Sequence, residues 1–409
     1  MKAKKPVAKR YIGLDIHKHY LVAVGVDPDG EQILGPQRVA MTQVEGWVQN
    51  KLETTDAVVI EMTTNTWQVH DDLQPYVHSV TVVHPPHVKL ITRAQVMTDR
   101  IAALNLAILH AKGLLVGIWV PPQEVRELRA LIAQRAKMSK LSVQARNRLH
   151  SVLHRHHLSL PKGGSPFHPK LHPWWVELPL STAEKVCVLS DLETLNFAQR
   201  QIELLENTLN GLAAQDERVP YLVQLTGINI ISAMTILGAI GTIVRFPAAK
   251  NLVGYAGLGA RIHDSGQTKR SGGITKAGRR DLRSTMIEAA WTAVRHDAHW
   301  KAEFKRLEPG LGRNKAVVAV ARKMLVAIWH ILTKKEAFRF AQPERTARKL
   351  LQFAYRLGAQ NRPAELSTKA YVRLILDQLG IAQDLTHIAW GGKKKPIILP
   401  PSSLPAPGD

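Results

Sequence analysis

The chain has 409 residues, 45% of them hydrophobic, and 55 Lys and Arg outnumber 33 Asp and Glu to give a formal net charge of +22. This length predicts two or three domains, and the charge favours a polyanionic partner, most commonly nucleic acid. The longest apolar run falls short of the about 18 residues that a spanning helix needs, so we expect no membrane partner. The single cysteine, Cys187, excludes an intrachain disulfide framework and a cysteine-rich zinc site. We therefore expect a cytoplasmic protein.

Two apolar runs near the N-terminus carry an acid at or near their ends. Asp15 lies near the end of the run from Tyr11 to His17, and Glu61 ends the run from Asp56. Runs rich in β-branched residues are typical of buried strands. A third acid, Asp99, opens the helical part of a segment predicted from Thr92 to Leu115. Because a carboxylate at the end of a buried strand is costly unless paired, we expect these acids to converge on Mg²⁺, which keeps water ligands for a phosphate.

The other elements between residues 11 and 112 predict an α/β domain. Asp27 to Gly30 has the composition of a hairpin turn, so a strand at 20–26 should pair antiparallel with one at 32–41. Further elements are a helix at 44–52 capped by Thr42, a helix at 67–77 and a short strand at 80–83. Three strands followed by alternating helices and strands is the element order of the ribonuclease-H fold.

Residues 123–158 predict one long basic helix. It holds Arg126, Arg129, Arg135, Lys137, Lys140, Arg146, Arg148 and Arg155 against Glu124 and Glu127. The excess of positive charge favours a phosphate-binding face, and a helix packed on a neighbour with a solvated charged face is the alternative. A connector at 160–179 leads to a second helix at 183–214, which forms either a helical hairpin with the first or a coiled-coil contact between chains.

Residues 219–335 predict a second compact unit. The bend from Leu225 to Asn229 resembles a helix-hairpin-helix motif, whose backbone amides hold a DNA phosphate, although an ordinary helix turn is the alternative. A polar, glycine-rich stretch follows at 260–278, then helices at 281–295 and 315–334. The basic residues of this region are Arg261, Lys269, Arg270, Lys276, Arg279, Arg280 and Arg283. Residues 391–396 and 400–409 have the composition of a flexible tail.

Several short motifs taken together resemble one family. They are Tyr11–Lys18, Ile60–Glu61, Thr98–Ile101, Leu225–Ile228, Gly254–Leu258, Ser265–Gly266, Ile274–Gly278 and Asp281–Arg283. In this order they resemble the DEDD insertion-sequence transposases, relatives of the Piv site-specific invertase. The resemblance implies an α/β RuvC-like ribonuclease-H domain followed by mainly helical parts. The implied divisions are a RuvC-like domain at 1–118, a basic helical or coiled-coil region at 119–218, a transposase domain at 219–340, and an extension with a flexible tail at 341–409.

The resemblance also implies the residues of the metal site. The acidic set carries over as Asp15, Glu61 and Asp99, which would hold Mg²⁺. The fourth acid of the family stands three residues after the third, one helical turn on and on the same face, where this chain has Ala102. Either the remaining three acids hold the metal more weakly, or the chain is an inactivated, decayed or engineered member.

A serine nucleophile is the second implication of the resemblance. The matching residue is Ser265, which precedes Gly266 and lies among Arg261, Lys269 and Arg270. A serine hydroxyl needs activation to attack a phosphodiester, and basic side chains or a metal can stabilise the charge that develops on phosphoryl oxygens. Ser271, also followed by glycine, is the second candidate.

The resemblance implies RNA-guided, site-specific DNA recombination for transposition through a phosphoserine intermediate. The partners implied are donor and target DNA, a structured bridge RNA, and further copies of the chain in a tetramer arranged as a dimer of dimers. Two alternatives stay open. One is a Mg²⁺-dependent junction endonuclease that uses water, and the other is a catalytically disabled nucleic-acid-binding protein, which Ala102 favours.

Overall fold

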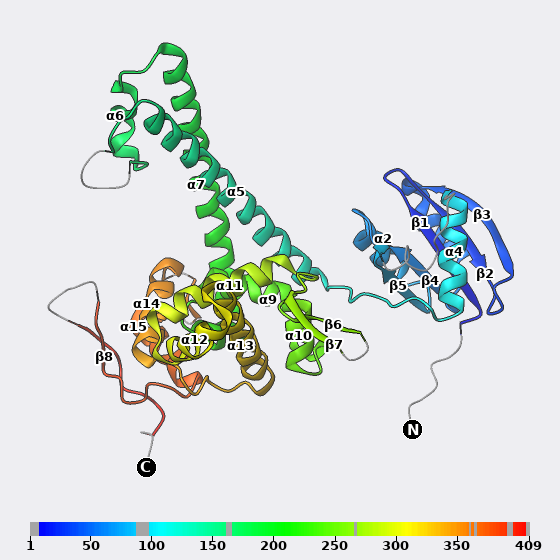
Figure 1. The fold of residues 1–409 in the computed structure, drawn as a ribbon. Coiled ribbons are helices and arrows are strands. Elements are labelled where there is room, and N and C mark those ends of the chain that lie inside the picture. Colours follow the sequence, from blue (N-terminus) through cyan, green and yellow to red (C-terminus); the bar gives the residue numbers. More distant parts are fainter. Residues whose placement is uncertain are drawn as a thin grey trace. The chain divides into compact units, whose positions relative to one another are not determined.

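The computed structural model describes residues 8–86, 98–160, 166–265, 268–359, 361–363, 366–390 and 396–405, with the backbone alone described at 262–265 and 268–271. The chain divides into two compact units, Met1–Pro122 and Gln123–Asp409 (Figure 1). The finer division into four segments stays a prediction.

Unit 1 is built on a five-stranded mixed sheet. Its strands are β1 (Arg10–Ile16), β2 (Tyr20–Val26), β3 (Gln32–Ala40), β4 (Asp56–Glu61) and β5 (Ser79–Val83). Their spatial order is β3-β2-β1-β4-β5, with β2 antiparallel to β1 and β3, and β4 parallel to β1 and β5. The predicted β2–β3 hairpin is confirmed, and Asp27 fixes its turn by accepting hydrogen bonds from the amides of Asp29, Gly30 and Glu31. The mixed α/β class predicted for this region is therefore confirmed.

Helices cover both faces of this sheet. One face packs on α1 (Val44–Lys51) and α2 (Thr66–Leu73), and the other on α4 (Asp99–Ala111). Thr42 does not cap α1 as predicted, because it lies in a 3₁₀ turn, Met41–Gln43, that precedes the helix. Thr98 caps α4 by accepting a hydrogen bond from the Ile101 amide, so this helix begins at Asp99. The predicted turns at 92–97 lie outside the described residues.

Helix α4 lies directly against β1 because Gly13 has no side chain. A Cβ atom at this position would lie 2.0 Å from the Ala103 carbonyl oxygen and 2.7 Å from the Ala107 amide nitrogen. Both neighbours are helix backbone, which cannot move aside without displacing the whole of α4. Gly13 therefore sets the distance between the sheet and this helix.

We expect Gly13→Ala to lower the free energy of unfolding of unit 1 by about 3 kcal/mol, because overpacking against rigid backbone carries costs of this order. Urea unfolding of the full chain, with hydrogen exchange of β1 and α4 peptides, measures the effect. Gly35→Ala is the matched control, since the nearest atom to its Cβ is a flexible Gln32 side-chain nitrogen at 3.9 Å. Equal protection of α4 in both variants would contradict the expectation.

Unit 2 is mainly helical. Its helices are α5 (Gln123–Arg155), α6 (His172–Glu177), α7 (Thr182–Gln215), α8 (Arg218–Val223), α9 (Ile230–Ile240), α10 (Ala249–Tyr255), α11 (Arg280–His296), α12 (Ala298–Leu311), α13 (Arg313–Lys334), α14 (Pro343–Leu357) and α15 (Thr368–Gln378), with 3₁₀ turns at Pro169–Leu171 and Ile243–Arg245. Two small hairpins complete it, β6 (Ala260–Ser265) with β7 (Thr268–Ile274) and β8 (His387–Ile388) with β9 (Ile397–Ile398). The stretch at 260–278, predicted only as polar and glycine-rich, therefore contains a β-hairpin.

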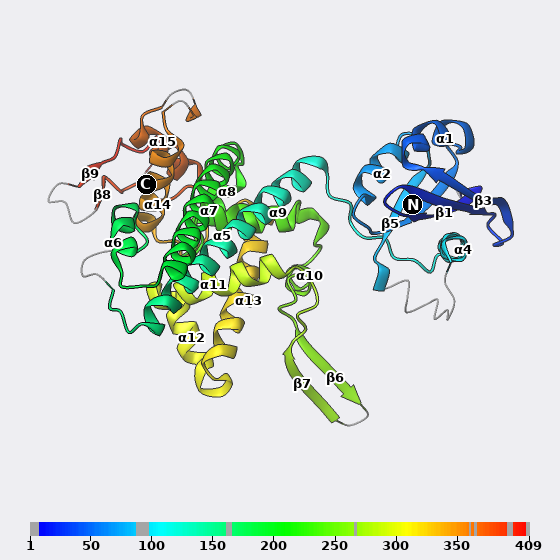
Figure 2. The same ribbon diagram turned by 90° about the horizontal axis from the view of Figure 1, so that it is seen from above.

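The long helices α5 and α7 lie side by side, as both views show (Figures 1 and 2). The ion pairs Arg135–Glu206 and Arg148–Asp191 occur in opposite order along the two helices, so the helices run antiparallel. The predicted helical hairpin is thus formed within one chain. A coiled-coil contact between chains stays a prediction.

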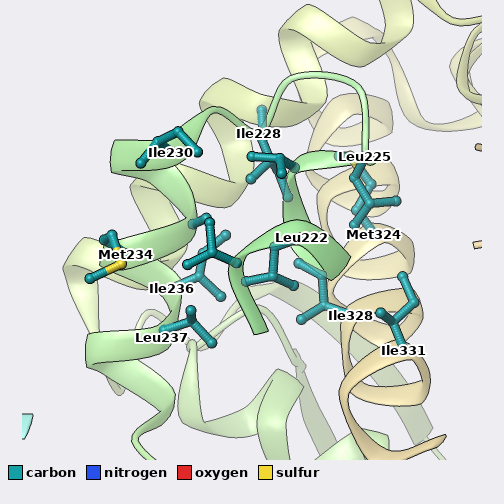
Figure 3. Close-up of a cluster of buried hydrophobic side chains, with 14 of the residues drawn as sticks. Leu222, Leu225, Ile228, Ile230, Met234, Ile236, Leu237, Met324, Ile328 and Ile331 are labelled. Atoms are coloured by element: carbon teal, nitrogen blue, oxygen red, sulfur yellow. The ribbon is translucent and has the colours of Figure 1, made fainter. Parts of the chain in front are cut away.

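The core of unit 2 is centred on α9 and α13. Figure 3 shows Leu222 of α8 packed between Ile236 of α9 and Ile328 of α13, with Ile228 of the turn after α8 in the same cluster. By length and composition, α13 is the one described helix that could cross a membrane, and half of its most apolar window is buried inside the unit.

Two helices of the region after residue 340 pack into the core of unit 2. Helices α14 and α15 contribute Leu350, Phe353 and Leu376 to the same core. The described part of the expected flexible tail, 396–405, contacts α15, since Ser402 and Ser403 donate hydroxyl hydrogen bonds to the Asp377 carboxylate. Residues 391–395 and 406–409 lie outside the described chain.

A lysine of α14 closes the turn between α8 and α9. The Lys349 Nζ donates to the carbonyl oxygens of Val223, Leu225 and Ile228 at 2.8, 2.7 and 2.8 Å. Burial lowers the pKa of this ammonium to about 7. The bend that resembles a helix-hairpin-helix turn is therefore stabilised from a part of the chain more than a hundred residues away.

Candidate active site

The acidic site of unit 1 is assembled by the contact between β1 and α4. Asp15 lies two residues after Gly13 and so projects from the same face of the sheet. Ala103, the residue that touches Gly13, lies one helical turn after Asp99. The close approach at Gly13 therefore brings Asp99, the first residue of α4, next to the end of β1.

An imidazole lies between the two carboxylates. The His17 Nε2 is 3.3 Å from Asp15 Oδ2 and 3.4 Å from Asp99 Oδ2. One possible ligand atom from each of these residues lies within 4.8 Å of the others. The Tyr20 hydroxyl donates to Asp99 Oδ2 at 2.9 Å, and its ring stacks on His17 with centroids 4.6 Å apart. These contacts hold Asp99 in place.

Sequence reasoning missed His17 and Tyr20 as site residues. The signal for His17 was present, since strand alternation places residues 15 and 17 on one face. Tyr20 belongs to β2, and its partner Arg38, whose guanidinium lies 3.8 Å from the ring centroid, belongs to β3. Their approach depends on the antiparallel pairing of these strands.

The charges of the site favour a cation. Burial raises the pKa of Asp15, with a smaller rise from the negative charge of Asp99 and an opposing effect from His17. The hydrogen bond to Asp99 raises the pKa of the Tyr20 hydroxyl. Two carboxylates from separate elements, close enough to bind one ion, fit a divalent metal ion that takes its remaining ligands from water.

Glu61 lies on the strand next to Asp15. Leu14 pairs with Ile60 in the parallel β1–β4 register, so Asp15 and Glu61 follow side by side on the face that α4 covers. The close cluster of ligand atoms in the described chain comprises Asp15, His17 and Asp99, without Glu61. Ala102 lies in the first turn of α4 and donates its amide hydrogen to the Thr98 carbonyl.

The motifs of unit 2 meet at the root of the β6–β7 hairpin. The Arg279 amide donates to the Tyr255 carbonyl at 2.8 Å and the Lys276 amide to the Gly257 carbonyl at 3.2 Å. Gly278 has a φ of +130°, and a Cβ there would lie 2.2 Å from the Tyr255 oxygen. The segments Gly254–Leu258 and Ile274–Gly278 thus form one anchored base for the hairpin.

Ser265 is the last residue of β6 and pairs with Thr268. Figure 2 shows the hairpin extending away from the helices of unit 2. Ser271 lies on β7 and pairs with Ile262. The side chains of both serines, and those of Lys269 and Arg270, lie outside the described part of the structure.

Two family models match the chain in these same regions. An IS110-type DEDD transposase model covers residues 12–158, and the "Transposase IS116/IS110/IS902 family" model covers residues 219–305. The chain belongs to the IS110/IS116 family of DEDD transposases. The resemblance expected from the motifs is confirmed, and the N-terminal domain is ribonuclease-H-like.

Curated relatives match this transposase along most of their length. It is 24% identical over 343 residues to the transposase for insertion sequence element IS1111A of Coxiella burnetii, covering 81% of this chain and 91% of the relative. It is 23% identical over 345 residues to the pilin gene-inverting protein of Moraxella bovis, covering 81% of this chain and 98% of the relative. The transposase is therefore a DNA-acting enzyme of the insertion-sequence type.

Several cations of the transposase that were predicted to bind nucleic acid make contacts within the chain. The Arg129 guanidinium donates to the Gly238 and Ala239 carbonyls, and burial lowers its pKa. Arg135 and Arg148 pair with acids of α7. In this part of α5 the cations help to pack the helix on its neighbours, which was the alternative interpretation of its charge.

Some of the remaining candidate cations also have partners within the chain, and others are exposed. Arg279 pairs with Asp281, and Arg283 donates to the Ala256 carbonyl at 3.0 Å. Arg126 also has partners within the chain, and the Arg146 guanidinium lies 5.7 Å from the Phe167 ring centroid. Among the described candidates, the exposed cations with no charged partner in the described part of the chain are Lys137, Lys140, Arg261, Lys276 and Arg280.

Proposed function

We propose that this transposase carries out site-specific DNA recombination guided by a structured bridge RNA, through a phosphoserine intermediate on Ser265 and with Mg²⁺ at the acidic site. The observation that supports it best is the approach of Asp15 and Asp99 from two different elements. Buried or half-buried carboxylates at such a distance repel one another and favour a shared cation.

Asp15, Glu61 and Asp99 would hold the metal. When bound, the ion supplies positive charge that stabilises the charge developing on the phosphoryl oxygens. Tyr20 positions Asp99 through its hydroxyl, and the His17 ring lies between the two carboxylates. Ala102 leaves the first turn of α4 with one acid fewer than the family pattern.

The proposed chemistry conserves phosphodiester bonds. The Ser265 Oγ attacks the scissile phosphorus and loses its proton, while the 3′-oxygen of the cut strand leaves and takes up a proton. A 3′-hydroxyl from another strand then attacks the phosphoserine and releases the serine hydroxyl. Exposed cations such as Arg261 and Lys276 at the root of the hairpin would contact the backbone phosphates.

In this proposal the DNA sequences that recombine are selected by base pairing with the guide RNA, as in other RNA-guided enzymes. The exposed cations of α5, Lys137 and Lys140, would contact the RNA backbone. The acids and the serine belong to different units, so we propose a composite site between subunits of a tetramer. The reaction would take place in the cytoplasm, where the DNA of a prokaryotic cell is accessible.

The purified full chain with its bound nucleic acid allows a direct test. Sequencing the extracted RNA should give one abundant structured species, and incubation with labelled DNA and Mg²⁺ should give a covalent protein–DNA adduct. Free hydrolysed ends without an adduct would instead indicate the water-using endonuclease. Binding without cleavage, even after Ala102→Asp, would indicate a disabled nucleic-acid-binding protein.

We expect Ala102→Asp to increase strand exchange at limiting Mg²⁺ by about tenfold, because an added carboxylate one turn from Asp99 strengthens ion binding. A Mg²⁺ titration of strand exchange measures this change. Ala102→Asn is the matched control, since it adds a similar volume without the charge. An unchanged Mg²⁺ dependence in Ala102→Asp would argue against a site of four acids.

A further inference from the structure

A cavity of about 810 Å³ lies in unit 2 at the root of the β6–β7 hairpin. Its walls come from segments far apart in the sequence, with Leu258 and Ile274 from the base of the hairpin, Ile287 from α11 and Val318 from α13. This volume is within the range of about 300–1,000 Å³ that is usual for sites of small organic ligands.

Among the described residues that line this cavity, the charged ones are all positive. Arg261 and Lys276 come from the hairpin side and Lys315 and Arg322 from α13, and all four side chains are exposed. The Arg261 Nη2 donates to the Thr275 carbonyl at 3.3 Å, which uses one of the five donors of the guanidinium among the described residues. Apolar walls below a rim of cations fit a ligand with a flat apolar body and phosphate groups.

One amide and one unusual backbone conformation add to this arrangement. Asn314 lines the cavity and offers both a donor and an acceptor, as the edges of bases require. Lys276 has a φ of +56°, a left-handed conformation that is strained for a residue other than glycine. The hydrogen bond from its amide to the Gly257 carbonyl holds this conformation and keeps the residue at the rim.

We propose that the cavity takes up one unpaired nucleotide of the DNA strand on which the hairpin acts. Its base would pack on the apolar walls with its edge on Asn314, and its flanking phosphates would contact the cationic rim, as in enzymes that extrude a base from the duplex.

This inference rests on the proposed function in one respect, the assignment of Ser265 as nucleophile. Because Ser265 belongs to the hairpin, that assignment implies that the nucleic acid bound beside the hairpin is DNA. Five steps of about 3.3 Å along β6 separate Ala260 from Ser265, or about 16 Å. At about 3.4 Å per nucleotide of duplex, the extruded nucleotide lies within about five positions of the scissile phosphate.

Gly273 provides a variant that fills the cavity. It lines the space, a Cβ there would meet no atom within 4 Å, and its φ is not in the left-handed region. Gly273→Leu should therefore occupy the cavity without straining the fold. Gly211→Leu is the matched control, since Gly211 in α7 also has nothing within 4 Å and does not line the cavity.

The test places 2-aminopurine at each position from six nucleotides before to six after the cut, in DNA bound by the full chain with its RNA. One position should brighten in the wild type and in Gly211→Leu, and its response should fall by about tenfold in Gly273→Leu. Lys315→Gln with Arg322→Gln, which changes exposed side chains only, should weaken the same response and lower the salt slope of DNA binding by about 0.9 for each lost contact.

No brightening in a wild-type complex that forms the covalent adduct would overturn the nucleotide site alone. The same holds if Gly273→Leu and the double variant both leave the response unchanged. Brightening without an adduct would support the nucleotide site and contradict the proposed nucleophile. Failure of the wild-type complex to bind DNA would overturn both proposals.

Discussion

Alanine at position 265 should leave the transposase able to bind DNA and unable to form a covalent link with it. The substitution removes the one oxygen that the proposed mechanism uses as nucleophile, and loss of a nucleophile lowers rates by about 10⁴-fold or more. Strand exchange should therefore fall below detection. Denaturing gels of labelled DNA, together with mass spectrometry of the adducted peptide, measure the result.

Ser271→Ala is the natural control for this experiment. Ser271 lies across the hairpin, paired with Ile262, and is also followed by glycine. Its variant should form the adduct as the wild type does, and both variants should bind DNA with the same salt dependence, since neither changes a charge. An adduct that persists in Ser265→Ala and disappears in Ser271→Ala would show that Ser271 of β7, and not Ser265, is the nucleophile.

Asp15→Asn should produce the second large effect. Asparagine keeps the shape of the side chain and removes the charge that would hold a divalent cation beside Asp99. We expect strand exchange to fall by about 10³-fold at saturating Mg²⁺, while DNA binding is retained. A Mg²⁺ titration followed by strand exchange, with binding measured in parallel, separates the two quantities.

Asp29→Asn is suited as its control, because Asp29 is an exposed acid of the same unit in the β2–β3 turn. The two variants carry the same change of net charge, so a general electrostatic effect on DNA binding would appear in both. Equal strand exchange by Asp15→Asn and the wild type would show that Asp15 is not part of a catalytic metal site.

The sequence predicted unit 1 well because its signals are local. Apolar runs that end near Asp15 and Glu61 identify β1 and β4, and the composition of Asp27 to Gly30 identifies a hairpin turn. The same signals placed two acids on neighbouring strands. The contact that brings Asp99 to Asp15 depends on Gly13, whose need for close packing shows only in the structure.

Unit 2 was harder to predict because its organisation depends on distant partners. Arg129 and Arg135 look like surface cations until α9 and α7 supply their acceptors. The β6–β7 hairpin is rich in polar residues and glycine, so it lacks the alternation that predicts strands. Helix α14 could have been predicted from its periodicity, since Leu350, Phe353 and Leu357 recur at helical spacing. The region was interpreted from its composition instead.

The position of Lys349 has a consequence for the order in which the chain is made. The α8–α9 turn is synthesised more than a hundred residues before the ammonium that donates to three of its carbonyl oxygens, of which that of Leu225 also accepts from the Ile228 amide. Each buried carbonyl without a donor costs about 1–3 kcal/mol, and a whole domain has only about 5–15 kcal/mol of stability. A nascent or prematurely terminated polypeptide that lacks α14 would hold this turn poorly. We therefore expect the α8–α9 turn to become stable only once α14 has been synthesised.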